Sequence, residues 1–137
     1  MEWFEQARAA EDRQDWDAAI ALVSARAECY SVDDQAHDSH LWHLRLLADA
    51  GRLAELTELA RTDVHARRRL NRTYQERGLG AELRERAAAG DRSALYCLLR
   101  MLGEAGHLAQ ARQAVAELAP ENAYAHRVLE ELAARVR

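Results

Sequence analysis

The chain has 137 residues, of which 49% are apolar, 6% aromatic and 31% charged, with a formal net charge of −4. All 19 basic residues are arginines, which excludes a Walker-type phosphate loop and a Schiff-base lysine, and the acidic balance argues against nucleic acid as a partner. A chain of this length is most simply one domain that buries roughly two thirds of its unfolded surface, and the small aromatic share favours closely packed helices.

One pattern recurs five times: an arginine followed four residues later by an acid, inside an apolar helical stretch. The five pairs are Arg8 and Asp12, Arg45 and Asp49, Arg72 and Glu76, Arg100 and Glu104, and Arg127 and Glu131. Successive arginines of these pairs are 37, 27, 28 and 27 residues apart. Repeats of this length are typical of stacked helical hairpins.

The first hairpin is expected over residues 2–29, with helices over about 2–13 and 16–28. Trp3, Ala7 and Ala10 lie on the first helix, and residues 15–23 read DWDAAIALV. These residues resemble a tetratricopeptide repeat. The resemblance implies that small side chains let the two helices approach closely and that the first helix of each hairpin lines a concave face.

A loop is expected next. Residues 30–38, YSVDDQAHD, are polar and poor in helix formers, so they predict a loop that ends where Asp38 or Ser39 caps the following helix. Shorter hairpins are then expected over residues 39–61, 63–89 and 91–119.

Glycines and aspartates mark the boundaries of these shorter hairpins. Gly51 and Gly106 each follow an apolar helix, where a left-handed C-cap is expected, and Asp63 and Asp91 stand where helix N-caps are needed. After Pro120, residues 121–137 predict a last helix that has no partner helix and caps the end of the stack.

Together these elements predict an all-α fold: a right-handed solenoid of αα-hairpins, TPR-like, with about nine helices in one domain over residues 1–137. The 27/28-residue units over residues 39–137 are similar to short αα repeats of actinobacterial proteins. That resemblance implies a bacterial helical-repeat scaffold with an interaction role rather than any chemistry.

In such an array, equivalent positions on the first helices form rows across the concave face. One row consists of the arginines of the repeated pattern, and a second row consists of the residues four positions before each of them. Together the two rows predict a groove. The partner-binding candidates are Leu41, Arg45, Arg68, Arg72, Tyr96 and Arg100. Because guanidinium forks bind carboxylates, the favoured function is a protein-interaction module for a peptide or partner protein with acidic character. The arginines could instead pair with neighbouring acids and only staple the repeats, and both interpretations stay open.

The alternative function is a regulatory or sensing domain that binds a small molecule or metal near His40, Trp42 and His43. His37 and Asp38 extend this cluster, but no second cluster supplies further ligands, so no metal and no cofactor are predicted. No motif combines a nucleophile, a base and an orienting group, so an enzyme is not predicted.

Cys29 and Cys97 show no metal spacing. They are expected to be reduced thiols, with a single bridge between them as the alternative. The sequence begins without a signal-peptide core and contains no apolar run near the roughly 20 residues of a membrane span. It therefore predicts a cytoplasmic protein, with a homodimer through the final helix left open.

Overall fold

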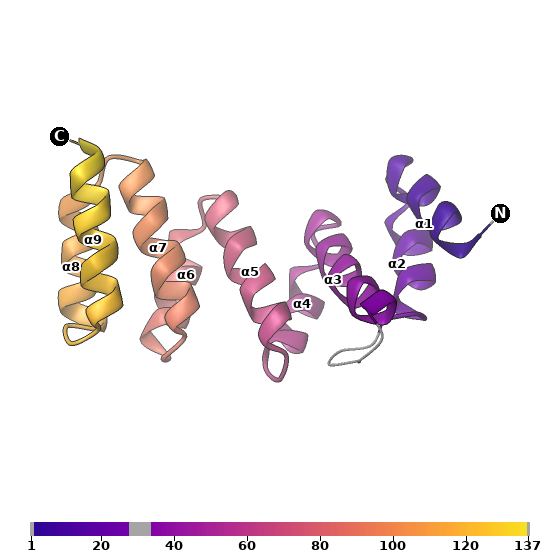
Figure 1. Ribbon diagram of the computed structural model, residues 1–137, viewed down its shortest axis with the longest axis horizontal. Helices are drawn as coiled ribbons and strands as arrows, with labels where there is room; N and C mark the ends of the chain where they lie inside the picture. Colours follow the sequence, from indigo (N-terminus) through magenta and orange to yellow (C-terminus); the bar gives the residue numbers. More distant parts are fainter. Residues whose placement is uncertain (1, 28–33, 137) are drawn as a thin grey trace. The chain divides into compact units, whose positions relative to one another are not determined.

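The computed structural model describes residues 2–27 and 34–136 (Figure 1). In these two segments every helix is an α-helix and there is no strand, which confirms the all-α prediction. The nine helices are α1 (Trp3–Asp12), α2 (Trp16–Ser24), α3 (Asp34–Asp49), α4 (Leu53–Ala60), α5 (Val64–Glu76), α6 (Gly80–Ala88), α7 (Arg92–Glu104), α8 (Leu108–Leu118) and α9 (Ala123–Val136).

Residue contacts divide the chain into two compact units, unit 1 (Met1–Leu70) and unit 2 (Asn71–Arg137). Unit 1 contains α1 to α4 and the first half of α5, and unit 2 contains the rest of α5 and α6 to α9. Neighbouring helices pack in pairs within each unit, such as α1 with α2, α3 with α4, and α7 with α8. The single domain, the hairpin boundaries and the right-handed solenoid stay predictions.

The core of unit 1 joins α1, α2 and α3. Its buried residues are Ala7, Ala10, Ala19, Ile20, Val23, Leu46 and Leu47, with Trp3, Trp16 and Trp42 packed against them and partly buried. Ala7 and Ala19 have no exposed surface. Small side chains at the contact between α1 and α2 leave room for the two backbones to come close.

The third helix begins earlier than the sequence predicts. α3 starts at Asp34, so the predicted loop over residues 30–38 is wrong for residues 34–38, and neither Asp38 nor Ser39 is an N-cap. Residues 28–33 lie outside the described residues. Ser39 and His40 are 4% and 7% exposed, so tertiary packing supports a helix through a segment whose intrinsic helix propensity is weak.

The predicted helix ends are found. Gly51 and Gly106 have φ angles of +74° and +78°, a conformation that glycine adopts without a Cβ penalty. Asp91 caps α7 by accepting the backbone N–H of Ala94 at 3.2 Å, and Asp63 accepts the N–H of His65 at 2.9 Å. These side chains satisfy backbone donors that the first turn of a helix leaves unpaired.

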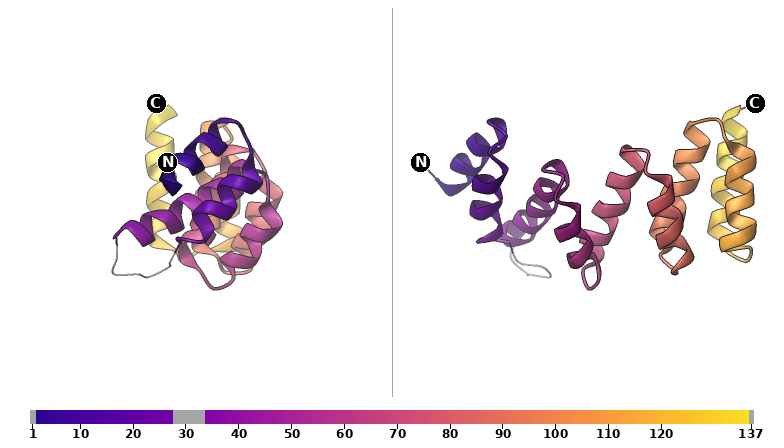
Figure 2. Two further views of the ribbon diagram at one scale, coloured as in Figure 1. Left: turned by 90° about the vertical axis from the view of Figure 1, so that its right-hand side faces the viewer. Right: turned by 180° about the vertical axis from the view of Figure 1, so that it is seen from behind.

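The core of unit 2 is built around α7, which packs against α6, α8 and α9. Leu95, Leu98 and Leu99 are buried in this core. α9 lies beside α8 and α7 (Figures 1 and 2), and a Cβ at Gly103 of α7 would overlap the side chain of Leu132 of α9. Gly103 therefore permits the close approach of these two helices.

Two smaller predictions concern the cysteines and the membrane. Cys97 is a buried free thiol, and burial raises its pKa above the ordinary value, whereas Cys29 lies outside the described residues. None of the described helices combines the length and the apolar character needed to cross a membrane.

Candidate functional site

The first predicted arginine with a defined environment is Arg45 of α3. Its guanidinium donates to both carboxylate oxygens of Glu11 on α1, at 3.0 and 3.1 Å, and to Asp49 at 3.2 Å. Trp42 Nε1 donates to the same Glu11 carboxylate at 2.7 Å. Glu11, Trp42 and Arg45 form what we call the Glu11 clamp, which ties α1 to α3.

The ionisation of the Glu11 clamp follows from these contacts. Burial raises the pKa of the Glu11 carboxyl, but hydrogen bonds from Arg45 and Trp42 outweigh that effect, and the net pKa lies below the ordinary 4.5. The hydrogen bond to Glu11 raises the pKa of Arg45. Both groups are therefore charged at neutral pH, and Arg45 is engaged by carboxylates of the protein itself.

The remaining predicted residues of α3 and α5 are exposed. Leu41 lies one turn before Arg45 and is 40% exposed. An exposed large apolar side chain is significant only where it belongs to a larger apolar patch. Arg68 and Arg72 are exposed on α5, and Arg72 Nε lies 3.2 Å from Glu76 across one helical turn. An exposed pair of this kind contributes about 0–1 kcal/mol, so Arg72 is easily released to a ligand.

Arg100 of α7 has a different environment from Arg45. Its guanidinium donates to the hydroxyl of Tyr124 on α9 at 3.3 Å, and the rings of Tyr96 and Tyr124 meet edge to face, with centroids 4.7 Å apart. Arg127 stacks over Tyr124, with its guanidinium carbon 6.0 Å from the ring centroid. We call Tyr96, Arg100, Tyr124 and Arg127 the tyrosine–arginine surface.

The arginines of this surface do not use the acids of the repeated pattern. Within the described residues, no ion pair joins Arg100 to Glu104 or Arg127 to Glu131. Tyr124 is 42% exposed, and both arginines are exposed. The surface thus offers two cations and an aromatic face to solvent, and no carboxylate of the described residues forms an ion pair with either cation.

An open cleft of about 780 Å³ adjoins the tyrosine–arginine surface. Its lining includes both tyrosines, with Asp91 and Arg92 at the start of α7 and Asn122 before α9. Asn122 caps α9 through the N–H of Ala125 at 3.0 Å and donates to the hydroxyl of Tyr96 at 3.0 Å. These bonds fix the orientation of Tyr96 before any ligand arrives.

The residues predicted for the alternative histidine site contact different neighbours. His40 Nε2 lies 2.6 Å from Asp63 Oδ2, although the two are not aligned as a hydrogen bond, and the His65 ring lies 6.0 Å from that of His40. Trp42 instead points to Glu11. Among the described residues no three His, Cys, Asp or Glu side chains are grouped to hold a metal ion.

Burial lowers the pKa of His43, and the charge of the neighbouring His40 lowers it further. His43 is therefore a neutral imidazole at physiological pH, held in a partly buried position on α3.

The structure groups the predicted residues by unit. Leu41 and Arg45 share α3 in unit 1, Tyr96 and Arg100 share α7 in unit 2, and α5 carries Arg68 in unit 1 and Arg72 in unit 2. Sequence reasoning missed Glu11 and Tyr124. Glu11 is not one of the five acids of the repeated pattern. Tyr124 lies on α9 next to the residue four positions before Arg127, and only its aromatic character could have drawn attention to it.

Comparison with protein-family models, curated proteins and solved structures finds no match to this chain. The resemblance to tetratricopeptide repeats therefore stays a prediction based on the residues of the first hairpin.

Proposed function

We propose that this protein is a non-enzymatic, cytoplasmic interaction module that binds an acidic segment of a partner protein at the tyrosine–arginine surface. The observation that carries the proposal is the state of Arg100. Its guanidinium is held by the hydroxyl of Tyr124 at 3.3 Å rather than by a carboxylate, so a ligand carboxylate has no charged competitor to displace.

The chemistry of the surface suits a peptide with acidic and apolar side chains. A guanidinium binds a carboxylate through two parallel hydrogen bonds, which are stronger than neutral ones. Tyrosine rings add rigid apolar contact area at a small entropic cost. Because Tyr96 is oriented by Asn122 and Tyr124 by Arg100, little ordering of the surface accompanies binding, which favours affinity.

Leu41, Arg45, Arg68 and Arg72 stay predicted partner-binding residues, each within its own unit, and we give them unequal roles. Arg68 and Arg72 are exposed and suit an acidic ligand. Arg45 is already bound to two acids, so its contribution is to hold α3 in place and to present Leu41.

Binding of defined peptides tests this function. The probe is an array of synthetic peptides rich in glutamate and leucine, paired with the same array in which every glutamate is replaced by glutamine. The binding variant is Arg100→Ala with Arg127→Ala. The matched control is Arg13→Ala with Arg61→Ala, since both side chains are exposed, at 63% and 72%, and the change in charge is the same.

Wild type and control should bind glutamate peptides and not their glutamine counterparts. The binding variant should lose about tenfold or more in affinity, because a hydrogen bond to a charged group contributes about 1.5–3 kcal/mol. Equal binding by the two variants would place the ligand elsewhere, and equal binding to the glutamate and glutamine arrays would contradict carboxylate recognition.

A further inference from the structure

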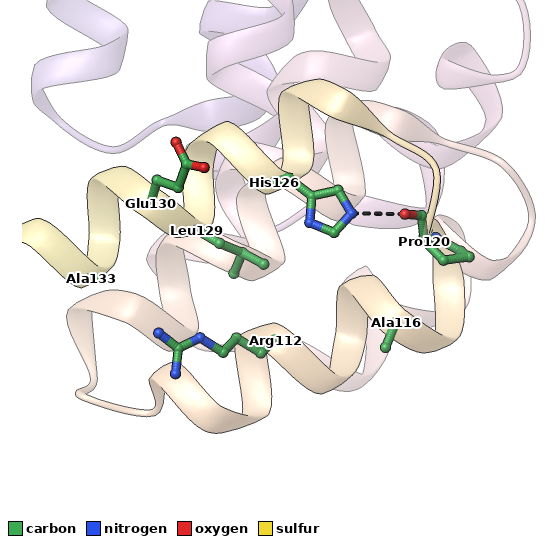
Figure 3. A pocket seen from close by; sticks show the side chains of 7 residues that line it. All are labelled: Arg112, Ala116, Pro120, His126, Leu129, Glu130 and Ala133. Atoms are coloured by element: carbon green, nitrogen blue, oxygen red, sulfur yellow. Dashed lines mark hydrogen bonds between the residues drawn. The ribbon is translucent and has the colours of Figure 1, made fainter.

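A second surface of unit 2 lies between α8 and α9, apart from the tyrosine–arginine surface. An open groove of about 740 Å³ runs there. Figure 3 shows the seven side chains that line it, which are Arg112, Ala116, Pro120, His126, Leu129, Glu130 and Ala133. We call it the α8–α9 groove.

The floor of the α8–α9 groove is apolar. Ala116 comes from α8, and Leu129 and Ala133 come from α9. Val136, which is 71% exposed, continues the same face of α9, since positions 129, 133 and 136 follow the helical spacing of one stripe. The apolar stripe on the floor of the groove thus continues beyond the groove toward the end of α9.

The walls of the groove carry opposite charges. Arg112 stands on α8 and Glu130 on α9 (Figure 3), and both are exposed. Among residues 2–27 and 34–136, neither side chain makes an ion pair. The apolar floor is therefore flanked by one cation and one anion whose charges are not neutralised by a contact within the described chain.

The shape of the groove is set before any partner binds. His126 Nε2 donates to the carbonyl oxygen of Pro120 at 2.7 Å (Figure 3). This bond ties the first turn of α9 to the segment that joins it to α8. The imidazole consequently stands as a fixed wall at one end of the groove.

From this arrangement we infer that the α8–α9 groove binds the α8–α9 groove of a second copy of this chain, in a two-fold homodimer. In a two-fold interface the same patch faces itself, so a residue that contacts a second residue is contacted by it in return. A patch with a cation on one wall and an anion on the other satisfies that condition, because Arg112 then faces Glu130 of the second copy, and the pair occurs twice.

The charges also explain why the second copy is the occupant that the groove fits. A helix of unrelated sequence would need an acid and a base at matching positions beside an apolar stripe. The second copy carries that combination by construction, with Leu129 and Ala133 as the apolar stripe. The patch is small, and small interfaces are weak, so a dissociation constant on the order of 10 µM is expected.

Charge reversal provides a sharp test with the full chain. Sedimentation velocity over a range of concentrations measures the self-association of wild type, Arg112→Glu, Glu130→Arg and the double variant. Glu85→Arg, an exposed residue of α6 in the same unit, is the control for the change in charge. Circular dichroism confirms equal helicity for each protein.

Each single reversal should raise the dissociation constant at least about tenfold, because it places like charges opposite each other twice in the dimer. An equimolar mixture of the two single variants should form a heterodimer, since every facing pair is then oppositely charged. The double variant should dimerise again, and Glu85→Arg should behave like wild type.

Three results would overturn the inference. Wild type that stays monomeric well above the expected dissociation constant would exclude the dimer. A dimer that both single variants retain would lie on another face. Single variants that fail to associate with each other when mixed would show that Arg112 and Glu130 do not face each other across the interface.

Discussion

Arg45 of α3 and Arg100 of α7 occupy the same position in the repeated pattern, and each has an acid four residues later, yet their environments differ. Arg45 is bound by Glu11 and Asp49, whereas Arg100 donates to the hydroxyl of Tyr124. The difference comes from the neighbouring helix, since α1 brings a carboxylate to Arg45 and α9 brings a phenol to Arg100. We therefore propose that the same motif serves stability in unit 1 and recognition in unit 2.

The two arginines also differ in what a ligand would have to displace. A carboxylate ligand at Arg45 competes with three hydrogen bonds that the guanidinium already donates to acids of the protein. At Arg100 it competes with one hydrogen bond that the guanidinium donates to an uncharged hydroxyl, a contact that lacks the attraction between opposite charges that holds Arg45 to its two acids. The copies of a repeated motif should thus be assigned functions one at a time.

The largest expected effect lies in the Glu11 clamp. Glu11→Ala removes the acceptor of both Arg45 and Trp42 and should lower the free energy of unfolding by about 1–3 kcal/mol, because two partly buried donors lose their partner. Urea unfolding followed by tryptophan fluorescence measures it, since Trp3, Trp16 and Trp42 all lie in unit 1.

Asp49→Ala is the control for Glu11→Ala. Asp49 contacts the same guanidinium, but its side chain is 46% exposed against 23% for Glu11, so its loss should be under about 1 kcal/mol. If the two variants were equally stable, Glu11 would not be the residue that distinguishes Arg45 from Arg100.

A smaller effect should appear with pH in unit 1. Burial, followed by the charge of His40, lowers the pKa of His43 from its ordinary 6.5. At a pH below this ordinary pKa, His43 binds a proton more readily in the unfolded chain than in the folded chain. The free energy of unfolding therefore falls as the pH decreases through the lowered pKa of the folded chain.

His43→Gln isolates this contribution from those of the other histidines. Between about pH 7.5 and about pH 5.5, the tryptophan-detected free energy of unfolding should fall more steeply for wild type than for His43→Gln. Parallel curves would show that His43 titrates equally in the folded and unfolded chain.

The smallest effect is expected at Arg72, whose side chain is 67% exposed and, among the described residues, forms an ion pair only with Glu76. Arg72→Ala should change the free energy of unfolding by no more than about 0.5 kcal/mol, the range of exposed pairs four residues apart on a helix. Urea unfolding followed by circular dichroism measures it. A loss as large as that of Glu11→Ala would mean that an acid four residues away is enough to make an arginine structural.

Much of the local structure could be predicted from sequence because it depends on neighbouring residues. Helical periodicity predicted the helices, Gly51 and Gly106 their ends, and Asp63 and Asp91 the starts of α5 and α7. The start of α3 could not be predicted, because burial of Ser39 and His40 comes from contacts between helices rather than from local propensity.

The candidate site was predictable only in part, for a related reason. The spacing of the pattern identified Arg45, Tyr96 and Arg100, since residues four apart share one face of a helix. It could not identify Glu11 or Tyr124, because their contacts with these arginines are 34 and 24 residues distant in sequence. A single sequence contains no signal for pairs at that distance.

The most direct test of the central claim compares Arg45→Ala with Arg100→Ala in urea titrations followed by circular dichroism. If the same motif is structural in one helix and available for recognition in the other, Arg45→Ala should lose about 1–2 kcal/mol of unfolding free energy and Arg100→Ala less than about 0.5 kcal/mol. Equal losses, or a larger loss for Arg100→Ala, would contradict the account.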